Sequence, residues 1–200
     1  MNVAESPTLE SIRTRIEHEL PVDAFGHALR TAQLARTLAS AHGVDEDRAE
    51  LAALVHDIAD GLSDGELLRL ADQFQIPISL TEARVPKLLH AAVGAEILRR
   101  DWGITDEEIL DAVRDHTTGG PHMSRLAKVL FLADKIEPAR DRHYGGLDPV
   151  RELAMRSLDE AILRLYGWRM DQLAATGGPV DERFIAARNR LIDQSLASRR

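Results

Sequence analysis

The chain has 200 residues, a formal net charge of −8, and 44% hydrophobic but only 4% aromatic residues. This length fits one domain, and a core poor in aromatics must be built from Leu, Ile, Val and Ala, which favours helix bundles over sandwiches. The negative charge opposes binding to a phosphate backbone, so we expect no nucleic-acid partner. The chain has no cysteine, which excludes disulfides, thiolate metal ligands and cysteine nucleophiles.

The N-terminal residues MNVAESPTLES lack the basic start and apolar run of a signal peptide. The longest apolar stretches, such as LAALV and VLFLA, are too short to cross a bilayer. We therefore expect a cytoplasmic protein with no membrane partner. The sequence leaves the oligomeric state open.

Helical periodicity dominates the chain, and no alternating strand pattern is present. Ser63 with Glu66, and Thr105 with Glu108, have the spacing of capping boxes, and Asp148 precedes a proline suited to a first helical position. The predicted helices span approximately residues 8–19, 23–42, 45–59, 63 onward, 87–100, 105–116, 123–136, 149–166 and 181–197. We expect an all-α bundle with the last two helices packed on its side.

Acidic and histidine side chains interrupt the apolar helices. His56 and Asp57 follow LAALV, and Asp134 interrupts VLFLADKIEP. Burying an unpaired carboxylate costs several kcal/mol, so a bound cation is its natural partner. With His27 on the preceding helix, these side chains could fill most of one octahedral site of the nitrogen and oxygen type that suits iron, manganese or zinc.

A second ion is predicted from two further histidines. His90 follows leucines in KLLHAAVGA, and His116 ends a predicted helix in AVRDHTTGG. With Asp57 as the bridge, these two histidines could hold another cation, and a paired site can polarise a phosphoryl group and generate hydroxide at neutral pH. The remaining histidines are expected to be ordinary polar residues: His18, His42, His122 and His143.

In this order, H…HD…H…H…D, the sequence resembles the HD superfamily of metal-dependent phosphohydrolases, and more narrowly the YqeK family of bacterial symmetrical diadenosine tetraphosphatases. The segments that carry the resemblance are HALRTAQLARTLA, ALVHDIAD, LLHAAVGAEI and DHTTGGPHMSRLAKVLFLADKIEPARD. The resemblance implies a single domain with an N-terminal helix (1–20), an HD metal-binding core (21–145) and two additional C-terminal helices (146–200).

The resemblance also implies a ligand set and a reaction. One ion would be held by His27, His56, Asp57 and Asp134, and the other by Asp57, His90 and His116. Both ions would be iron, with manganese or another divalent ion as the alternative. His56 and Asp57 would be catalytic, and diadenosine tetraphosphate, the nucleotide partner, would be cleaved symmetrically to two ADP.

Further residues of the same motifs are candidate substrate contacts: Thr117, Thr118, Lys135, Arg140 and Asp60. The threonines could instead satisfy backbone groups in their turn, and Arg140 could instead pair with Glu137. Two positions depart from the family pattern, because Asp60 and Gly120 stand where many members have Lys and Arg. We expect Asp60 to bind a metal-bound water rather than to repel substrate, and an arginine at position 120 to tighten binding.

Because of these two departures, the sequence alone does not decide which nucleotide is the substrate. Basic residues that could compensate for the missing charges are Arg125, Lys128 and Arg142. One alternative is an HD phosphohydrolase acting on another nucleotide phosphoester, such as a mononucleotide or an alarmone. Another is a metal-binding regulatory protein without turnover, although six intact ligands argue against it. An acidic chain without a basic recognition helix does not suit a DNA-binding domain.

Overall fold

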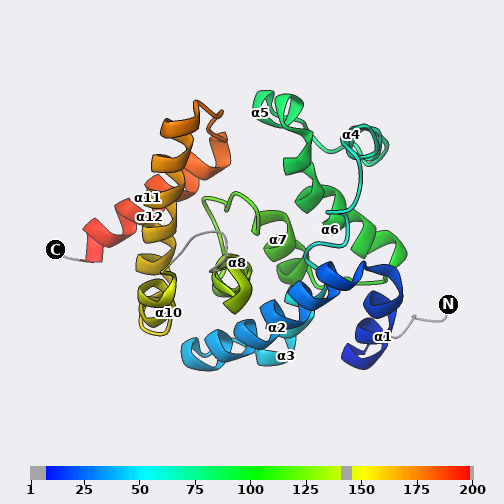
Figure 1. Cartoon of the computed structure of the whole chain (residues 1–200), viewed down its shortest axis with the longest axis horizontal. Helices are drawn as coiled ribbons and strands as arrows, with labels where there is room; N and C mark the ends of the chain where they lie inside the picture. The colour runs from blue at the N-terminus through cyan, green and yellow to red at the C-terminus, as the bar shows by residue number, and fades with distance from the viewer. Residues whose placement is uncertain (1–7, 141–145, 199–200) are drawn as a thin grey trace.

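The computed structural model describes residues 8–140 and 146–198, and within these ranges it is helical with no strand (Figure 1). This agrees with the all-α prediction. His143 and Arg142 lie outside the described residues. None of the described helices is both long enough and apolar enough to cross a membrane.

The elements in chain order are α1 (Leu9–Glu19), α2 (Val22–His42), α3 (Glu46–Val55), α4 (Asp64–Gln73), α5 (Leu80–Arg84), the 3₁₀ helix η1 (Pro86–Leu89), α6 (His90–Asp101), α7 (Glu107–Asp115), α8 (Arg125–Ile136), the 3₁₀ helix η2 (Pro138–Arg140), α10 (Asp148–Ala154), α11 (Leu158–Thr176) and α12 (Glu182–Ser198).

Several predicted caps are present. Asp45 caps α3 by accepting from the amide of Arg48, and Ser63 and Glu66 form the predicted reciprocal capping box at the start of α4. Gly43 ends α2 with φ of 64°, a left-handed conformation that glycine adopts at little cost. Local sequence chemistry therefore sets these three boundaries.

The third helix is shorter than predicted, because α3 ends at Val55 and residues 56–61 form turns. The imidazole Nδ1 of His56 lies 2.7 Å from the carbonyl oxygen of Ala53, which would otherwise accept from the amide of Asp57. A side chain that competes for a helical acceptor favours the end of the helix. The amide of Asp60 instead bonds to the carbonyl of Asp57 at 2.9 Å, so these acids share a turn and not a helix face.

The capping box predicted from Thr105 and Glu108 is wrong. Asp106 is the N-cap of α7, and its Oδ1 accepts from the amides of Glu108 and Ile109 at 3.0 and 3.3 Å. Arg48 also donates to both carboxylate oxygens of Asp106, at 2.9 and 2.7 Å. A long-range ion pair thus favours Asp106 over its neighbour, and local spacing does not reveal such a pair.

The prediction of one helix over residues 149–166 is also wrong. The chain forms α10, breaks, and starts α11 at a new cap, the side chain of Ser157, which accepts from the amide of Glu160 at 3.3 Å. Helix α11 then continues ten residues beyond Tyr166, to Thr176. Helix α5 was not predicted, since it is too short to show periodicity. The helix predicted over 87–100 begins as the 3₁₀ turn η1 and becomes α-helical at His90.

The most apolar helix, α8, lies at the centre of the bundle, with α2, α3, α7, α10 and α11 packed against it (Figure 1). Its leucines, together with Leu38 of α2 and Leu54 of α3, belong to one large buried core. A smaller cluster around Leu67 fixes α4 against α6. The helices that carry polar residues toward the centre are therefore held by apolar packing on their other faces.

Leu130 of α8 is fully buried, whereas Leu196 of α12 is 54% exposed. We expect Leu130→Ala to lower the free energy of unfolding by about 2–5 kcal/mol, because it leaves a cavity that the neighbouring helices cannot fill. Leu196→Ala, the matched control, should change it by less than about 0.5 kcal/mol. Urea titration followed by circular dichroism measures both, and equal effects would contradict the central placement of α8.

Candidate metal centre

Six polar side chains from five segments lie together at the centre of the bundle: His27 from α2, His56 and Asp57 from the end of α3, His90 from the start of α6, His116 from the end of α7, and Asp134 from α8. Three groups of them place donor atoms within 4.8 Å of one another: His27, His56 and Asp134; His56, Asp57 and His116; and Asp57 and His90 together with Asp60.

Three of the histidine rings are oriented in the same way. In His56, His90 and His116, Nδ1 lies 2.7, 2.6 and 2.7 Å from the backbone carbonyl oxygen three residues earlier. A carbonyl can only accept, so Nδ1 carries the proton in each ring. In the neutral ring Nε2 is then the free lone pair, and it faces the centre of the cluster.

The fourth ring, that of His27, is held by a residue that the sequence analysis did not select as a site residue. Nδ1 of His27 lies 3.2 Å from Oε1 of Glu137, which is only 2% exposed. The same carboxylate accepts from Nε of Arg30 at 2.8 Å and from the amide of Ala139 at 2.7 Å. Glu137 therefore turns Nε2 of His27 inward, as carboxylates behind metal-binding histidines do.

The nitrogen atoms of this cluster need a cation. Nε2 of His90 lies 3.0 Å from Nε2 of His116, and both are lone pairs when the rings are neutral. Nε2 of His56 is fully buried and is the one such side-chain atom in the described ranges without a hydrogen-bond partner. A buried orphan and two opposed lone pairs are costly in an apolar core. The donor set fits a divalent metal.

Asp57 has the geometry of a bridge. Its Oδ1 lies 3.2 Å from Nε2 of His116 and 3.4 Å from that of His90. Its Oδ2 faces the other way, 3.2 Å from Nε2 of His56 and 3.7 Å from that of His27. Each carboxylate oxygen is thus directed at a different pair of histidines.

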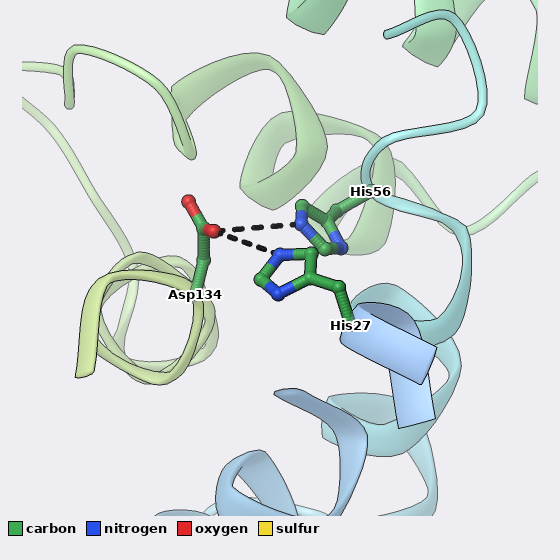
Figure 2. A group of neighbouring side chains, drawn as sticks. All are labelled: His27, His56 and Asp134. Carbon is green, nitrogen blue, oxygen red and sulfur yellow. Dashed lines mark hydrogen bonds and ion pairs between the residues drawn. The ribbon is translucent and has the colours of Figure 1, made fainter. Parts of the chain in front are cut away.

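Asp134 completes the group that contains His27 and His56. Its Oδ1 lies 3.1 Å from Nε2 of His27 and 3.7 Å from Nε2 of His56, and Figure 2 shows the carboxylate pointing from α8 toward both rings. Lys135 and Arg140 bind the same carboxylate, at 2.6 Å each. The group of His27, His56 and Asp134 therefore joins three segments that are far apart in sequence.

The charges in the cluster are strongly coupled. Burial disfavours the protonated form of His56, but Asp57 and Asp134 outweigh burial and raise its pKa to about 10. Nε2 of His56 therefore takes up a proton unless a metal ion binds its lone pair. For His116 burial dominates and lowers the pKa to about 4. Burial would raise the pKa of Asp57, yet the charge of His56 holds it well below the ordinary value. Asp57 is therefore ionised, in the form that binds cations.

A cavity of about 1060 Å³ opens onto the cluster. All of the predicted ligands line it except His56, which lies behind the others with no exposed surface. The residues predicted as substrate contacts also line it: Asp60, Thr117, Thr118, Lys135 and Arg140. Two of these have local partners as well, since Oγ1 of Thr118 donates to the carbonyl of Gly119 at 3.3 Å and Nζ of Lys135 to that of His116 at 2.8 Å.

The departure at Asp60 has a partner that the sequence analysis missed. Nζ of Lys87, just before α6, lies 2.8 Å from Oδ1 of Asp60 and also donates to its backbone carbonyl. The two charges cancel, so the cavity wall at position 60 is close to neutral. This pair removes most of the repulsion that an isolated acid would exert on phosphates.

The departure at Gly120 is explained by packing. A Cβ atom at this position would lie 2.6 Å from both carboxylate oxygens of Asp115, which in turn pairs with Arg183 of α12. On the other side of the loop, the hydroxyl of Tyr166 donates to the carbonyl of Thr118 at 3.2 Å. Helices α11 and α12 thus hold the loop that follows His116, and an arginine at position 120 does not fit there.

The described residues among the remaining histidines and the candidate compensating cations lie away from the cavity lining. His18 and His122 are exposed, and Nε2 of His42 lies 2.7 Å from the carbonyl of Ala154. Arg125 is exposed and Lys128 pairs with Asp159 at 2.6 Å. Neither of these two cations can replace a phosphate contact in the cavity.

Comparison with known proteins agrees with this geometry. The profile of the HD domain family matches residues 24–139. The chain belongs to the HD domain family. HD-domain hydrolases bind divalent metals, and the five segments that carry the cluster all lie within the matched residues.

The chain is similar to two proteins named "Bis(5'-nucleosyl)-tetraphosphatase, symmetrical". The one from Bacillus subtilis is 37% identical over 74% of this chain and 78% of that protein. The one from Halalkalibacterium halodurans is 34% identical over 88% of this chain and 93% of that protein. A crystal structure of a predicted HD superfamily hydrolase involved in NAD metabolism from Clostridium acetobutylicum matches with a TM-score of 0.89 and 30% identity, covering 94% of this chain and 99% of the other.

Gly120→Arg should impair the protein rather than tighten substrate binding, because its Cβ would overlap the Asp115 carboxylate. We expect a loss of about 1–3 kcal/mol in stability, as for overpacked sites, and a fall in activity. The double variant Asp115→Ala/Gly120→Ala should recover more than half of what Gly120→Ala alone loses. Additive losses in thermal unfolding would show that the two positions do not interact.

Lys87→Ala should leave Asp60 as an uncompensated acid on the cavity wall. We expect the KM for a polyphosphate substrate to rise several-fold with little change in kcat, because repulsion acts on the bound anion before reaction. Lys87→Ala/Asp60→Asn should return the KM close to its original value. If the double variant is no better than Lys87→Ala, the Asp60 charge does not affect binding.

Proposed function

We propose that this protein hydrolyses diadenosine tetraphosphate symmetrically to two ADP. The names of its relatives support this substrate class. The observation that carries the proposal is the division of the Asp57 oxygens between two groups of ligands at the base of a cavity of about 1060 Å³. That volume is at the upper end of the range for small-molecule sites, as a dinucleotide requires.

We propose two divalent ions, iron in both places with manganese as the alternative. His27, His56, Asp57 and Asp134 would hold one, and Asp57, His90 and His116 the other. When bound, such ions supply Lewis acidity toward phosphoryl oxygens and make hydroxide available near neutral pH. Nitrogen and oxygen ligands of this kind suit both metals.

In the proposed reaction, a water oxygen bonds to one of the two central phosphorus atoms. The bond from that phosphorus to the central bridging oxygen breaks, and this oxygen leaves on the second ADP. No protein nucleophile is needed. Asp57 and His56 are the proposed catalytic residues. Asp57 lines the cavity, whereas His56 lies behind it and would act only through the ion that it holds.

The cavity cations and hydroxyls would bind the phosphates. Lys135 and Arg140 approach the centre through Asp134, so that they place positive charge beside the reacting phosphoryl groups. Oγ1 of Thr117 lies 3.2 Å from Nε2 of His90 and lines the cavity. We assign the core over residues 21–145 to the chemistry, and the helices over 146–200 to the support and wall of the cavity.

A second candidate is an HD phosphohydrolase that acts on a less highly charged nucleotide phosphoester. The neutral pair of Asp60 with Lys87, and the glycine at position 120, favour it, because both positions lack the positive charge that the family pattern has there. Assay of a nucleotide panel with added iron or manganese separates the two candidates. The first predicts that diadenosine tetraphosphate is the best substrate and yields ADP as the sole nucleotide, whereas the second predicts faster turnover of a mononucleotide or an alarmone.

Asp57→Asn should abolish turnover and lower the metal content of both groups, since the bridging charge is lost while the side-chain volume is kept. Elemental analysis of protein purified without chelators, with chromatography of the products, measures both effects. His18→Ala, an exposed histidine outside the cavity, is the control and should keep activity within about twofold. Full turnover by Asp57→Asn would disprove the two-metal proposal.

A further inference from the structure

Helix α11 presents one face to the cavity that contains the metal centre. The side chains of this face recur at intervals of three or four residues, as one side of a helix requires: Leu165, Trp168, Arg169, Gln172 and Leu173. In Figure 1, α11 and α12 lie on the opposite side of α7 and α8 from α4 and α5. The cavity therefore has a wall supplied by the C-terminal helices, outside the residues matched by the family profile.

The chemistry of this wall differs from that of the metal centre. Leu165, Trp168 and Leu173 are apolar and half-buried, and Pro179 and Phe184 continue the apolar surface toward α12. These apolar side chains offer no hydrogen bond to a phosphate. The wall suits a flat, largely apolar group that needs an aromatic contact, which is the character of a nucleobase.

Trp168 has a cation–π contact with an arginine of its own helix. The guanidinium of Arg164 lies over its ring at 5.4 Å from the centroid, and Arg164 does not line the cavity. Such a cation–π contact is worth about 0.5–1 kcal/mol at an exposed site, and it favours this orientation of the ring.

Arg169 and Gln172 add polar groups at the edge of the apolar surface. The guanidinium of Arg169 donates to the neutral amide oxygen of Gln172, whereas the cavity cations Lys135 and Arg140 both bind Asp134. Within residues 8–140 and 146–198, Arg169 has no carboxylate partner, so its guanidinium can donate to a base edge, a ribose hydroxyl or an α-phosphate.

We propose that this face of α11 is the subsite for one of the two nucleosides of the substrate, with Trp168 as the stacking platform and Arg169 as its polar contact. The inference rests on the proposed function for the identity of the substrate. The wall and the metal centre border the same cavity, so one molecule can reach both. The subsite gives the C-terminal helices a role in selecting dinucleotides over inorganic polyphosphates.

Fluorescence tests the subsite without turnover. The chain has two tryptophans, and Trp102 is only 5% exposed and lies against Arg15, away from the cavity lining. In Trp102→Phe, ADP should produce a saturable quench of the Trp168 emission, and inorganic tripolyphosphate should produce none. Should Trp102→Phe fail to fold, the same titration of the unmodified protein and of Trp168→Phe is compared, and the ADP quench should vanish in the variant.

Kinetics give a second measurement. Trp168→Ala should raise the KM for diadenosine tetraphosphate about tenfold, the effect of losing one base stack, with kcat nearly unchanged. Arg169→Gln should raise it several-fold. Leu163→Ala is the matched control, because Leu163 lies on the same helix, packs against the core and does not line the cavity. It should leave the KM within about twofold.

The outcomes separate the subsite from the proposed reaction. Base-dependent quenching in a protein that does not cleave diadenosine tetraphosphate would support the subsite and overturn the proposed function. Cleavage to ADP together with an unchanged KM in Trp168→Ala, or with equal responses to ADP and tripolyphosphate, would overturn the subsite and leave the reaction intact.

Discussion

The same local hydrogen bond, from Nδ1 to the backbone carbonyl three residues earlier, is made by each of three rings and orients them: His56, His90 and His116. In the middle of an α-helix that carbonyl is already engaged by the amide four residues ahead of it. The interaction is therefore easiest where a helix starts or stops. His56 and His116 are the C-caps of α3 and α7, and His90 joins η1 to α6. The helix boundaries and the ligand directions are consequences of the same contact.

This arrangement makes the centre dependent on a cation. Three rings with fixed protons direct lone pairs at Asp57, and two of those lone pairs face each other at 3.0 Å. Apolar side chains in these positions would make the bundle more stable, because burying polar groups without partners lowers the free energy of unfolding. The apolar packing of α2, α3, α7 and α8 around the cluster holds it in place. Ligand binding then adds its own stabilisation to the folded chain.

Much of the fold could be predicted because it follows from local signals. The capping box at Ser63 and the left-handed Gly43 are examples, and the apolar run of α8 marks the central helix. One error arose where a distant residue decides the helix boundary, and another where a local cap was overlooked. Asp106 replaces the predicted cap because Arg48 binds it from another helix. The break between α10 and α11 comes from a new cap at Ser157, which competes with continuous periodicity.

In the candidate site too, local sequence signals identified some residues, and tertiary contacts determine the others. The six predicted ligands converge because each interrupts an apolar helix or follows an apolar run, and such positions point inward in a bundle. Their role as ligands stays a prediction. The supporting groups could not be found in this way. Glu137 and Tyr166 act on His27 and on the loop after His116 through tertiary contacts with no characteristic spacing. Only the position of Glu137, three residues after Asp134, offered a signal.

The two departures from the family pattern show how far position-by-position comparison can be trusted. At position 60 an acid replaces the usual lysine, yet Lys87 supplies an ammonium group at 2.8 Å from another segment. At position 120 the arginine is absent because Asp115 fills the space, and Arg183 of α12 neutralises that acid. In both cases an acid and a basic residue from a different element occupy the region together. Asp60 lines the cavity, whereas Asp115 and Arg183 do not. The pair of Asp60 with Lys87 therefore keeps the charge of the wall balanced, and the charge at one aligned position does not determine the field that a phosphate meets.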